Sequence, residues 1–175
     1  MYKIAILGPE STGKTELAGR LAEHFQSPWV PEYAREYVEN LTHHPYTYGD
    51  VCNIALKQIE EELFYEKFSE DKEFVFFDTD LIITKVWFSY CFKKVPVFLT
   101  ERIKTGFFDL YLLCTADLPW EPDSVREHGE DRDYFFDWYR KEIEQTGKPY
   151  VVVSGIGNQR FQNALGALSI LNKRT

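Results

Sequence analysis

The feature that most constrains this chain is a glycine-rich segment near its N-terminus, which reads GPESTGKT over residues 8–15. It fits the pattern G-x-x-x-x-G-K-[ST], in which backbone N–H groups surround the phosphates of a nucleoside triphosphate. The short apolar run before it, residues 2–7, is typical of a buried parallel strand. The residues after it are apolar at helical spacing and predict a helix over about 14–25. A strand, a glycine loop and a helix in this order predict a triphosphate site and count against an accidental glycine turn.

Each residue type in this segment suits phosphate binding. Glycines permit backbone conformations that residues with a Cβ avoid, so that successive N–H groups can turn toward one anion. The helix that follows adds unpaired N–H groups and the positive end of its dipole. Lys14 is expected to reach the β- and γ-phosphates, and the Thr15 hydroxyl is expected to be a ligand of Mg²⁺. The predicted triphosphate contacts are Gly8, Glu10, Ser11, Thr12, Gly13, Lys14 and Thr15.

The composition limits the classes of protein to which this chain can belong. A chain of 175 residues with 44% hydrophobic residues is expected to form a single domain with a substantial core. Lys and Arg number 20 against 28 Asp and Glu, and this net charge of −8 argues against a nucleic-acid partner. No apolar run approaches the roughly 20 residues that span a bilayer, and the first strand leaves no room for a signal peptide. We therefore expect a cytoplasmic protein without a membrane partner. The cysteines form no C-x-x-C pair and the histidines have no metal-ligand spacing, so neither zinc nor a disulfide framework is expected, and the histidines should be solvated.

The rest of the chain alternates between predicted strands and helices. Short apolar runs predict strands over 27–33, 73–77, 108–114 and 150–153. Helical spacing predicts helices over 34–41, 50–68, 81–92 and 100–106, over the segment before Gly147, and after residue 157. In the longest of these, Asp50 is the expected N-cap, and Leu63 and Phe64 are expected on the buried side. This alternation implies βαβ crossovers, and hence an α/β domain with a five-stranded parallel sheet covered on both faces.

One polar connection is longer than the others and is predicted to be a lid. Residues 115–133 form this segment, and long loops in compact domains are usually functional. Arg126 and Arg132 lie in it, and arginines on a lid can neutralise the charge of a transferring phosphoryl group. The alternative is a surface loop in which both arginines pair with neighbouring acidic residues, and the sequence leaves the two open.

A carboxylate follows the buried run at residues 74–77. Asp78 at such a strand end is typical of a Walker B site, and Mg²⁺ prefers oxygen ligands, so Asp78 would complete the metal shell opposite Thr15. Asp80, two residues on, could share that role or contact the substrate. The alternative is a solvated strand end at which an aspartate begins a helix.

Polar side chains are also predicted at the ends of other strands, where ligands collect in open parallel sheets. Glu32 could orient a hydroxyl and accept its proton. Arg35, one helical turn on, could contact a phosphate, or it could pair with Glu32 as a surface ion pair. Trp120 lies between two prolines, where it is better placed to stack on a planar ring than to pack in a core. Ser154 and Gly155 follow the last strand and are predicted to bind the nucleotide.

Taken together, these segments resemble the ribosylnicotinamide kinase domain of NadR-type proteins. The matching segments are the loop at 8–15, WVPEYAREY at 29–37, FDTD at 77–80, and LPW at 118–120 with Arg126 downstream. The resemblance implies a P-loop kinase-like three-layer sandwich with strand order 2-3-1-4-5. It also implies transfer of the γ-phosphate of ATP, with Mg²⁺, to the 5′-hydroxyl of nicotinamide riboside, giving nicotinamide mononucleotide for NAD synthesis.

The resemblance also implies roles for individual residues. Residues 8–15 would hold ATP and Mg²⁺, with the two lid arginines above them. Glu32 or Asp78 would handle the ribose and its 5′-hydroxyl. Trp120, together with Tyr33, would stack on the nicotinamide, whose positive charge favours electron-rich rings. Many NadR proteins also carry an adenylyltransferase domain, for which we expect no room in this chain.

Two other functions stay open on the sequence. The acceptor could be another nucleoside or a nucleotide monophosphate, or the chain could be a regulatory P-loop NTPase without a small-molecule acceptor. The oligomeric state is open in every case. The leading hypothesis predicts catalysis by Lys14, Glu32, Asp78, Arg126 and Arg132. It predicts substrate contacts from Glu32, Tyr33, Arg35, Asp78, Asp80 and Trp120.

Overall fold

The computed structural model describes residues 1–43, 45–122 and 129–172. Within these ranges, five strands form one parallel sheet in the order β2-β3-β1-β4-β5, which confirms the predicted fold class and strand order. In register, Ile4 lies between Phe76 and Leu110 of the neighbouring strands. The strands are β1 (Tyr2–Leu7), β2 (Trp29–Val30), β3 (Phe74–Asp78), β4 (Leu110–Cys114) and β5 (Tyr150–Val153).

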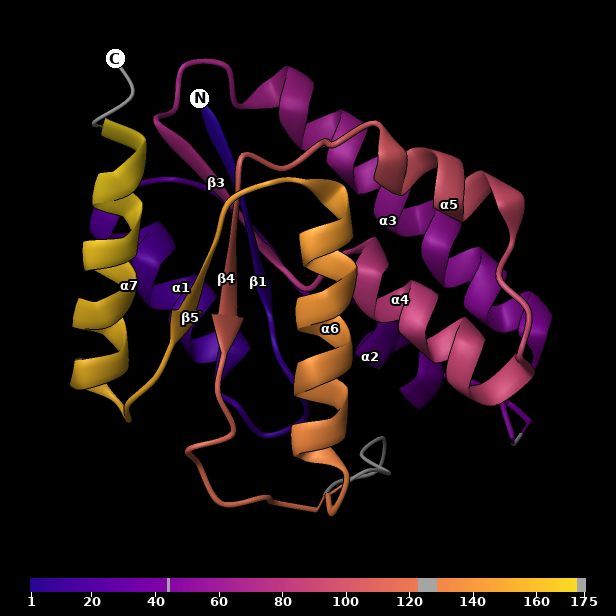
Figure 1. Ribbon diagram of the computed structural model, residues 1–175. Helices are drawn as coiled ribbons and strands as arrows, with labels where there is room; N and C mark the ends of the chain where they lie inside the picture. The colour runs from indigo at the N-terminus through magenta and orange to yellow at the C-terminus, as the bar shows by residue number, and fades with distance from the viewer. Residues whose placement is uncertain (44, 123–128, 173–175) are drawn as a thin grey trace.

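Helices cover both faces of this sheet and make a three-layer sandwich (Figure 1). One face carries α1 (Lys14–Phe25) and α7 (Asn158–Asn172), and the other carries α4 (Leu81–Trp87) and α6 (Arg132–Thr146). Outside α4 lie α3 (Tyr48–Phe68) and α5 (Val97–Lys104), which share a separate apolar cluster with it. The short helix α2 (Tyr33–Glu39) follows β2, and a π-helical turn continues α4 over Phe88–Phe92.

The side-chain alternation of the strands explains the two apolar cores. Successive side chains of a strand point to opposite faces. Ile4 and Ile6 therefore pack with α1 and α7, whereas Ala5 and Leu7 pack with α4 and α6. Every residue of β3 and β4 is buried, because both strands lie inside the sheet with helices on each side. This is why these two strands read as continuous apolar runs in the sequence.

The second strand is shorter than predicted. It comprises Trp29–Val30 rather than 27–33, and it pairs with β3 at the edge of the sheet. Pro28 and Pro31 flank it, and a proline has no N–H to donate to a ladder. The chain then enters α2 at Tyr33, with Glu32 as the N-cap residue at the edge of the sheet.

The N-terminus of α3 contradicts the prediction that Asp50 is its N-cap. Thr47 occupies that position, and Asp50 is the third residue of the helix. The Asp50 N–H donates to Thr47 Oγ1 at 3.2 Å, and the Thr47 N–H donates to Asp50 Oδ2 at 2.7 Å. This reciprocal capping box satisfies two N–H groups at once. The helix consequently begins at Tyr48, ahead of the predicted start.

The expectation that Leu63 and Phe64 lie on the buried side of α3 is also wrong, since they are 51% and 52% exposed. The buried face continues instead through Gln58 and Glu62. The side-chain amide oxygen of Gln58 accepts a hydrogen bond from the Thr84 hydroxyl at 2.6 Å, and the Glu62 carboxylate accepts one from Arg102 Nε at 2.8 Å. Because these polar groups are satisfied inside the fold, an apolar pattern alone could not locate this face.

Two further helix boundaries differ from prediction. The helix expected over 100–106 is α5, which begins at Val97 directly after Pro96. The helix expected over 81–92 is α-helical to Trp87 and π-helical beyond it.

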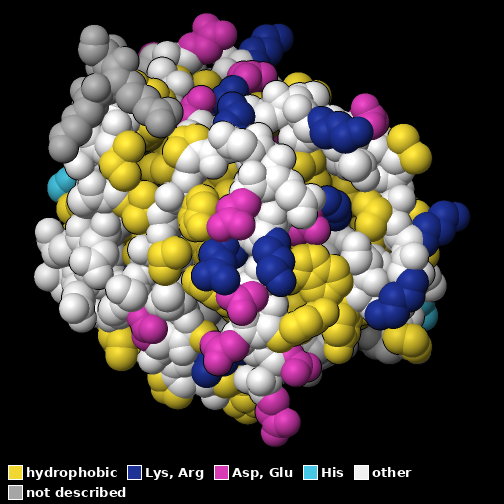
Figure 2. Space-filling model, in the orientation of Figure 1, with side chains coloured by type: hydrophobic (Ala, Val, Ile, Leu, Met, Phe, Trp, Pro, Cys, Tyr) yellow, Lys and Arg dark blue, Asp and Glu magenta, His cyan; other side chains and the backbone are white. Residues whose placement is uncertain are grey.

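On the face viewed in Figure 2, basic and acidic side chains are interspersed. None of the helices in the described ranges has the length and apolar character needed to cross a membrane.

Candidate functional site

The loop between β1 and α1 has a closed conformation that depends on its glycines. Gly8 and Gly13 have φ angles of 155° and 70°, which residues with a Cβ rarely adopt. A Cβ on Gly8 would also lie 2.8 Å from the carbonyl oxygen of Cys114. The Lys14 ammonium donates a hydrogen bond to the Pro9 carbonyl oxygen at 2.9 Å, so its charge lies against the loop. The segment predicted to hold a triphosphate therefore forms a folded loop at the N-terminus of α1, where a helix favours anions.

Asp78 lies at the end of β3, beside this loop. Its Oδ2 accepts a hydrogen bond from the Thr15 hydroxyl at 2.5 Å. Its Oδ1 is buried and has no hydrogen-bond partner among the described residues. A buried carboxylate oxygen without a partner is costly, and a cation would satisfy it. Thr15 and Asp78 together therefore fit a Mg²⁺ ion, which takes few protein oxygens and keeps several waters.

A cavity of about 670 Å³ extends from this loop across the carboxyl edge of the sheet. Its volume is within the range of small-molecule sites. The loop lines it through Gly8 and residues 10–15, and α2 lines it through Ala34, Arg35 and Val38. The cavity thus joins the phosphate loop to side chains from segments far away in the sequence.

Glu32 is the carboxylate that lines this cavity at the end of β2. Burial raises the pKa of Glu32 above its ordinary value, and the Lys14 ammonium opposes this shift. The carboxylate of Asp78 raises the pKa of Glu32 further, and Arg35 lowers it. Burial likewise raises the pKa of Asp78, again against Lys14. Lys14, Glu32 and Asp78 are therefore close enough to influence one another electrostatically, and groups with shifted pKa values cluster at functional sites.

Aromatic rings from several segments also line the cavity, and the sequence reasoning assigned none of them to a site. Tyr46 meets Trp87 edge-to-face with ring centroids 4.8 Å apart, and Tyr90 meets Phe135 at 5.1 Å. Tyr139 of α6 lies in the same lining. Trp87 and Tyr90 lie one helical turn apart, but this spacing is equally typical of a core face. We refer to Tyr46, Trp87, Tyr90, Phe135 and Tyr139 as the aromatic wall.

Trp120 lies on the phosphate loop, outside the set of described residues that line the cavity. Its indole N–H donates to the Glu10 carboxylate at 3.2 Å. Gly129 packs so closely on the indole that a Cβ there would fall 2.6 Å from its Cδ2 atom. The neighbouring Glu121 N–H donates to Ser11 Oγ at 3.1 Å. The start of the long connection is therefore attached to the phosphate loop, and Trp120 is part of that attachment.

Of the two arginines predicted for the lid, the structure describes one. Arg126 lies outside the described residues. Arg132 is the first residue of α6, and its guanidinium donates to the Leu118 carbonyl oxygen at 2.7 Å. Arg132 thus ties the two ends of the long connection together in this structure.

A third arginine, which the sequence reasoning missed, lies beneath the nucleotide side. Arg160 of α7 is 3% exposed, and it donates to the carbonyl oxygens of Gly155 at 2.7 Å and Thr115 at 3.0 Å. The Gly155 N–H donates to the Asp117 carboxylate at 2.5 Å. Ser154 is also tied to α7, because its carbonyl oxygen accepts a hydrogen bond from the Asn163 amide at 3.0 Å. Arg160 therefore joins the ends of β4 and β5, and no motif in the sequence marks it.

Asp80 is not among the described residues that line the large cavity. It is 4% exposed, and its Oδ1 accepts a hydrogen bond from the Ile82 N–H at 2.9 Å, so it caps α4. It lines a separate, small internal space of about 20 Å³ together with Glu62. Tyr33 borders this space and an outer groove rather than the large cavity. Burial, assisted by the charge of Glu62, raises the pKa of Asp80 to about 8.

We expect Asp80→Asn to flatten the dependence of stability on pH. The pKa of Asp80 is about 8 in the folded protein and ordinarily 3.8, so between these values the folded state binds more protons than the unfolded state. Its contribution to the free energy of unfolding therefore falls as the pH rises. Asparagine keeps the oxygen that caps α4 but does not titrate. Urea unfolding at about pH 5.5 and about pH 8 should show the variant gaining up to about 3 kcal/mol over the wild type.

Asp71→Asn is the matched control, because Asp71 is an exposed aspartate at the same sheet's opposite end, in the turn before β3. The pH dependence measured for Asp71→Asn is the baseline against which that of Asp80→Asn is compared. If Asp80→Asn and Asp71→Asn behaved alike, Asp80 would not be a protonated buried carboxyl.

The fold and the site define a P-loop nucleotide-binding domain of the kinase type. The sequence matches the AAA domain family over residues 3–160, and the chain belongs to this family. Two curated relatives are both named Trifunctional NAD biosynthesis/regulator protein NadR. The protein of Salmonella typhimurium is 31% identical over 135 residues, and that of Escherichia coli is 30% identical over 157 residues. The alignments cover 74% and 86% of this chain but 32% and 37% of the relatives, so the chain spans about a third of their length.

Solved structures extend this homology to the fold. NadR in complex with NR superimposes with a TM-score of 0.70 at 26% identity, over 95% of this chain and 49% of that one. NadR in complex with NAD and AMP-PNP gives 0.68 at 27% identity, over 95% and 48%. Thymidylate kinase from Ehrlichia chaffeensis shares the fold, with a TM-score of 0.66 at 12% identity over 97% and 98% of the two chains. The predicted resemblance to the NadR family is confirmed, and the fold together with this homology supports a kinase.

Proposed function

We propose that this protein is a ribosylnicotinamide kinase, which transfers the γ-phosphoryl group of ATP to the 5′-hydroxyl of nicotinamide riboside. The observation that carries the proposal is one cavity that joins the phosphate loop, the Glu32 carboxylate and the aromatic wall. Such a cavity has a place for a triphosphate, a hydroxyl and a planar ring. The NadR complexes with NR and with NAD and AMP-PNP support the choice of acceptor and donor.

On the donor side, the phosphate loop would bind ATP through its N–H groups. Lys14 would exchange its bond to the Pro9 carbonyl for one to the β- and γ-phosphates. Thr15 and Asp78 would hold Mg²⁺, which supplies charge neutralisation on the phosphates when it is bound. Arg132 and Arg126 are proposed to serve the lid.

On the acceptor side, Glu32 would accept a hydrogen bond from the 5′-hydroxyl and take up its proton. Its raised pKa brings the carboxylate closer in basicity to neutral pH, which favours this role. Trp87 and Tyr46 would lie against the nicotinamide ring. A pyridinium cation is attracted to the faces of electron-rich rings, and the attraction grows when water is excluded. Loose phosphoryl transfer depends mainly on such positioning.

The test is direct assay of the purified protein with ATP, Mg²⁺ and a panel of acceptors. We expect nicotinamide mononucleotide to form from nicotinamide riboside, with one ADP released for each product. Release of ADP only with another nucleoside or a nucleotide monophosphate would overturn the choice of acceptor. Slow release of ADP that no acceptor accelerates would instead indicate a regulatory NTPase.

A further inference from the structure

The helix α2 separates two hollows of the surface. Ala34, Arg35 and Val38 line the large cavity, whereas Tyr33, Glu36, Tyr37 and Asn40 line an outer groove of about 350 Å³. At about 100° per residue, these two sets lie on nearly opposite faces of the helix. None of the residues of α2 is buried. The helix is therefore a thin wall of the proposed acceptor site, and packing against a core does not fix its position.

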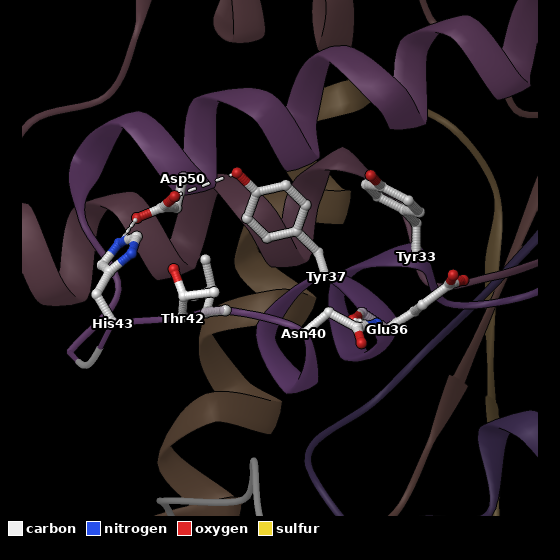
Figure 3. Close-up of a pocket in the computed structure, with 8 residues that line it drawn as sticks. Tyr33, Glu36, Tyr37, Asn40, Thr42, His43 and Asp50 are labelled. Carbon is white, nitrogen blue, oxygen red and sulfur yellow. Dashed lines mark hydrogen bonds and ion pairs between the residues drawn. The ribbon is translucent and has the colours of Figure 1, made fainter.

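Asp50, across the outer groove, provides a polar attachment for this wall (Figure 3). Its Oδ1 accepts a hydrogen bond from the Tyr37 hydroxyl at 3.1 Å, and its Oδ2 lies 3.1 Å from His43 Nε2. The same Oδ2 accepts hydrogen bonds from the Thr47 N–H at 2.7 Å and the Thr47 hydroxyl at 2.6 Å. One carboxylate thus joins α2, the connection after it and the N-terminus of α3. The sequence predicted that His43 is solvated and did not predict its contact with Asp50.

The charge of Asp50 makes this attachment strong. Hydrogen bonds from the side chain and the backbone of Thr47, followed by those from His43 and Tyr37, hold the pKa of Asp50 well below its ordinary value. The carboxylate is therefore ionised at neutral pH, and hydrogen bonds to an ionised acceptor are about twice as strong as neutral ones. Asn53 of α3 donates to the Tyr37 hydroxyl at 3.0 Å as well. Tyr37 is consequently held by two residues of α3, Asp50 and Asn53.

We propose that Asp50 is a positioning residue for the acceptor site, acting through the Tyr37 hydroxyl to hold α2 against that site. The inference rests on the proposed function, since it assigns α2 to the acceptor. It follows from two observations: α2 carries Arg35 and Val38 into the large cavity and begins directly after Glu32, and it has no buried residue of its own. Loosening the attachment would let this wall move away from the acceptor while the phosphate loop, on β1 and α1, stays in place.

Tyr37→Phe tests the proposal, because it removes the hydroxyl and keeps the ring. We expect the KM of the acceptor to rise about tenfold, as the loss of one hydrogen bond to a charged group predicts, while the KM of ATP changes less than about twofold. Amide hydrogen exchange over residues 33–39 should quicken in the ligand-free protein. The unfolding midpoint should fall by no more than a few degrees, so that a rise in the acceptor KM does not reflect loss of the fold.

Tyr150→Phe is the matched control. It removes a tyrosine hydroxyl that donates to the Glu144 carboxylate at 2.7 Å, at the start of β5 and thus at the opposite edge of the sheet. It should change neither KM nor the exchange over 33–39. Unchanged exchange in Tyr37→Phe would overturn the attachment, and faster exchange with an unchanged acceptor KM would overturn the positioning role. If the wild type did not phosphorylate nicotinamide riboside, the proposed function would fail, and the inference would be decided by the exchange and by the KM of whichever acceptor is used.

Discussion

Replacing Lys14 with alanine is expected to lower kcat by roughly 10²- to 10³-fold, as does the removal of one donor aimed at transition-state charge. The Lys14 ammonium lies 2.9 Å from the Pro9 carbonyl oxygen, against the loop that would surround the phosphates. In the proposed reaction, negative charge would spread over the transferring phosphoryl group, and this ammonium would help to neutralise it. The measurement is turnover at saturating ATP and acceptor, with the unfolding midpoint recorded to show that the fold is intact.

Lys57→Ala is the matched control for this prediction, because Lys57 is a lysine on the surface of α3 that pairs with Glu60. Its turnover should equal that of the wild type. Glu32→Gln should cost less than Lys14→Ala, since loose phosphoryl transfer needs charge neutralisation and positioning more than a strong base. Equal losses for Lys14→Ala and Lys57→Ala would show that general charge, rather than this ammonium, matters.

The second large effect is expected from Trp87→Ala, which should raise the KM of the acceptor roughly 10- to 100-fold, the range found when a stacking ring is removed. Trp87 lines the large cavity in edge-to-face contact with Tyr46 at 4.8 Å. Truncating it removes the proposed stacking surface and also the support of Tyr46. Trp87→Phe should recover much of the loss. The measurement is the KM of nicotinamide riboside at saturating ATP.

Trp120→Ala is the matched comparison, because it makes the same change at the tryptophan that the sequence favoured. The Trp120 indole N–H donates to Glu10 of the phosphate loop at 3.2 Å. Its loss should therefore act mainly on the KM of ATP. A rise in the acceptor KM for Trp120→Ala, with none for Trp87→Ala, would return the ring-stacking role to Trp120 and contradict the aromatic wall.

The donor side of the site could be predicted from the sequence because its chemistry is local. The loop, its preceding strand and its following helix are contiguous over residues 2–25, and two glycines at fixed spacing mark the conformation. Asp78 was predicted by the same logic, from a buried run that ends in a carboxylate, and it lies beside the loop in hydrogen-bond contact with Thr15. The sheet order came from the family resemblance, since strand alternation alone gives a parallel sheet but not its order.

The proposed acceptor side could not be predicted in the same way, because the tertiary fold assembles it from separate segments. Tyr46, Trp87 and Tyr139 come from three segments, and an aromatic residue at helical spacing usually indicates a core face. Trp120 attracted the prediction because its prolines made it look poorly packed, but Glu10 and Gly129 hold it on the loop. Gln58 and Glu62 lie on the buried face of α3 in place of Leu63 and Phe64, because each binds a partner distant in the sequence.

The two ends of the large cavity differ in what they are made of, and this has a consequence for how such a protein can diverge. The donor end depends on main-chain N–H groups and on glycine conformations, which few substitutions can alter without breaking the loop. The other end is made of side chains from α2, the connection before α3, α4, the π-helical turn and α6, and substitutions there leave the phosphate loop unchanged. On the proposed function, descendants of this chain could therefore acquire new acceptors by a few point mutations while keeping the same phosphoryl donor. In the laboratory, the same division recommends randomising Tyr46, Trp87 and Tyr90 and leaving residues 8–15 untouched.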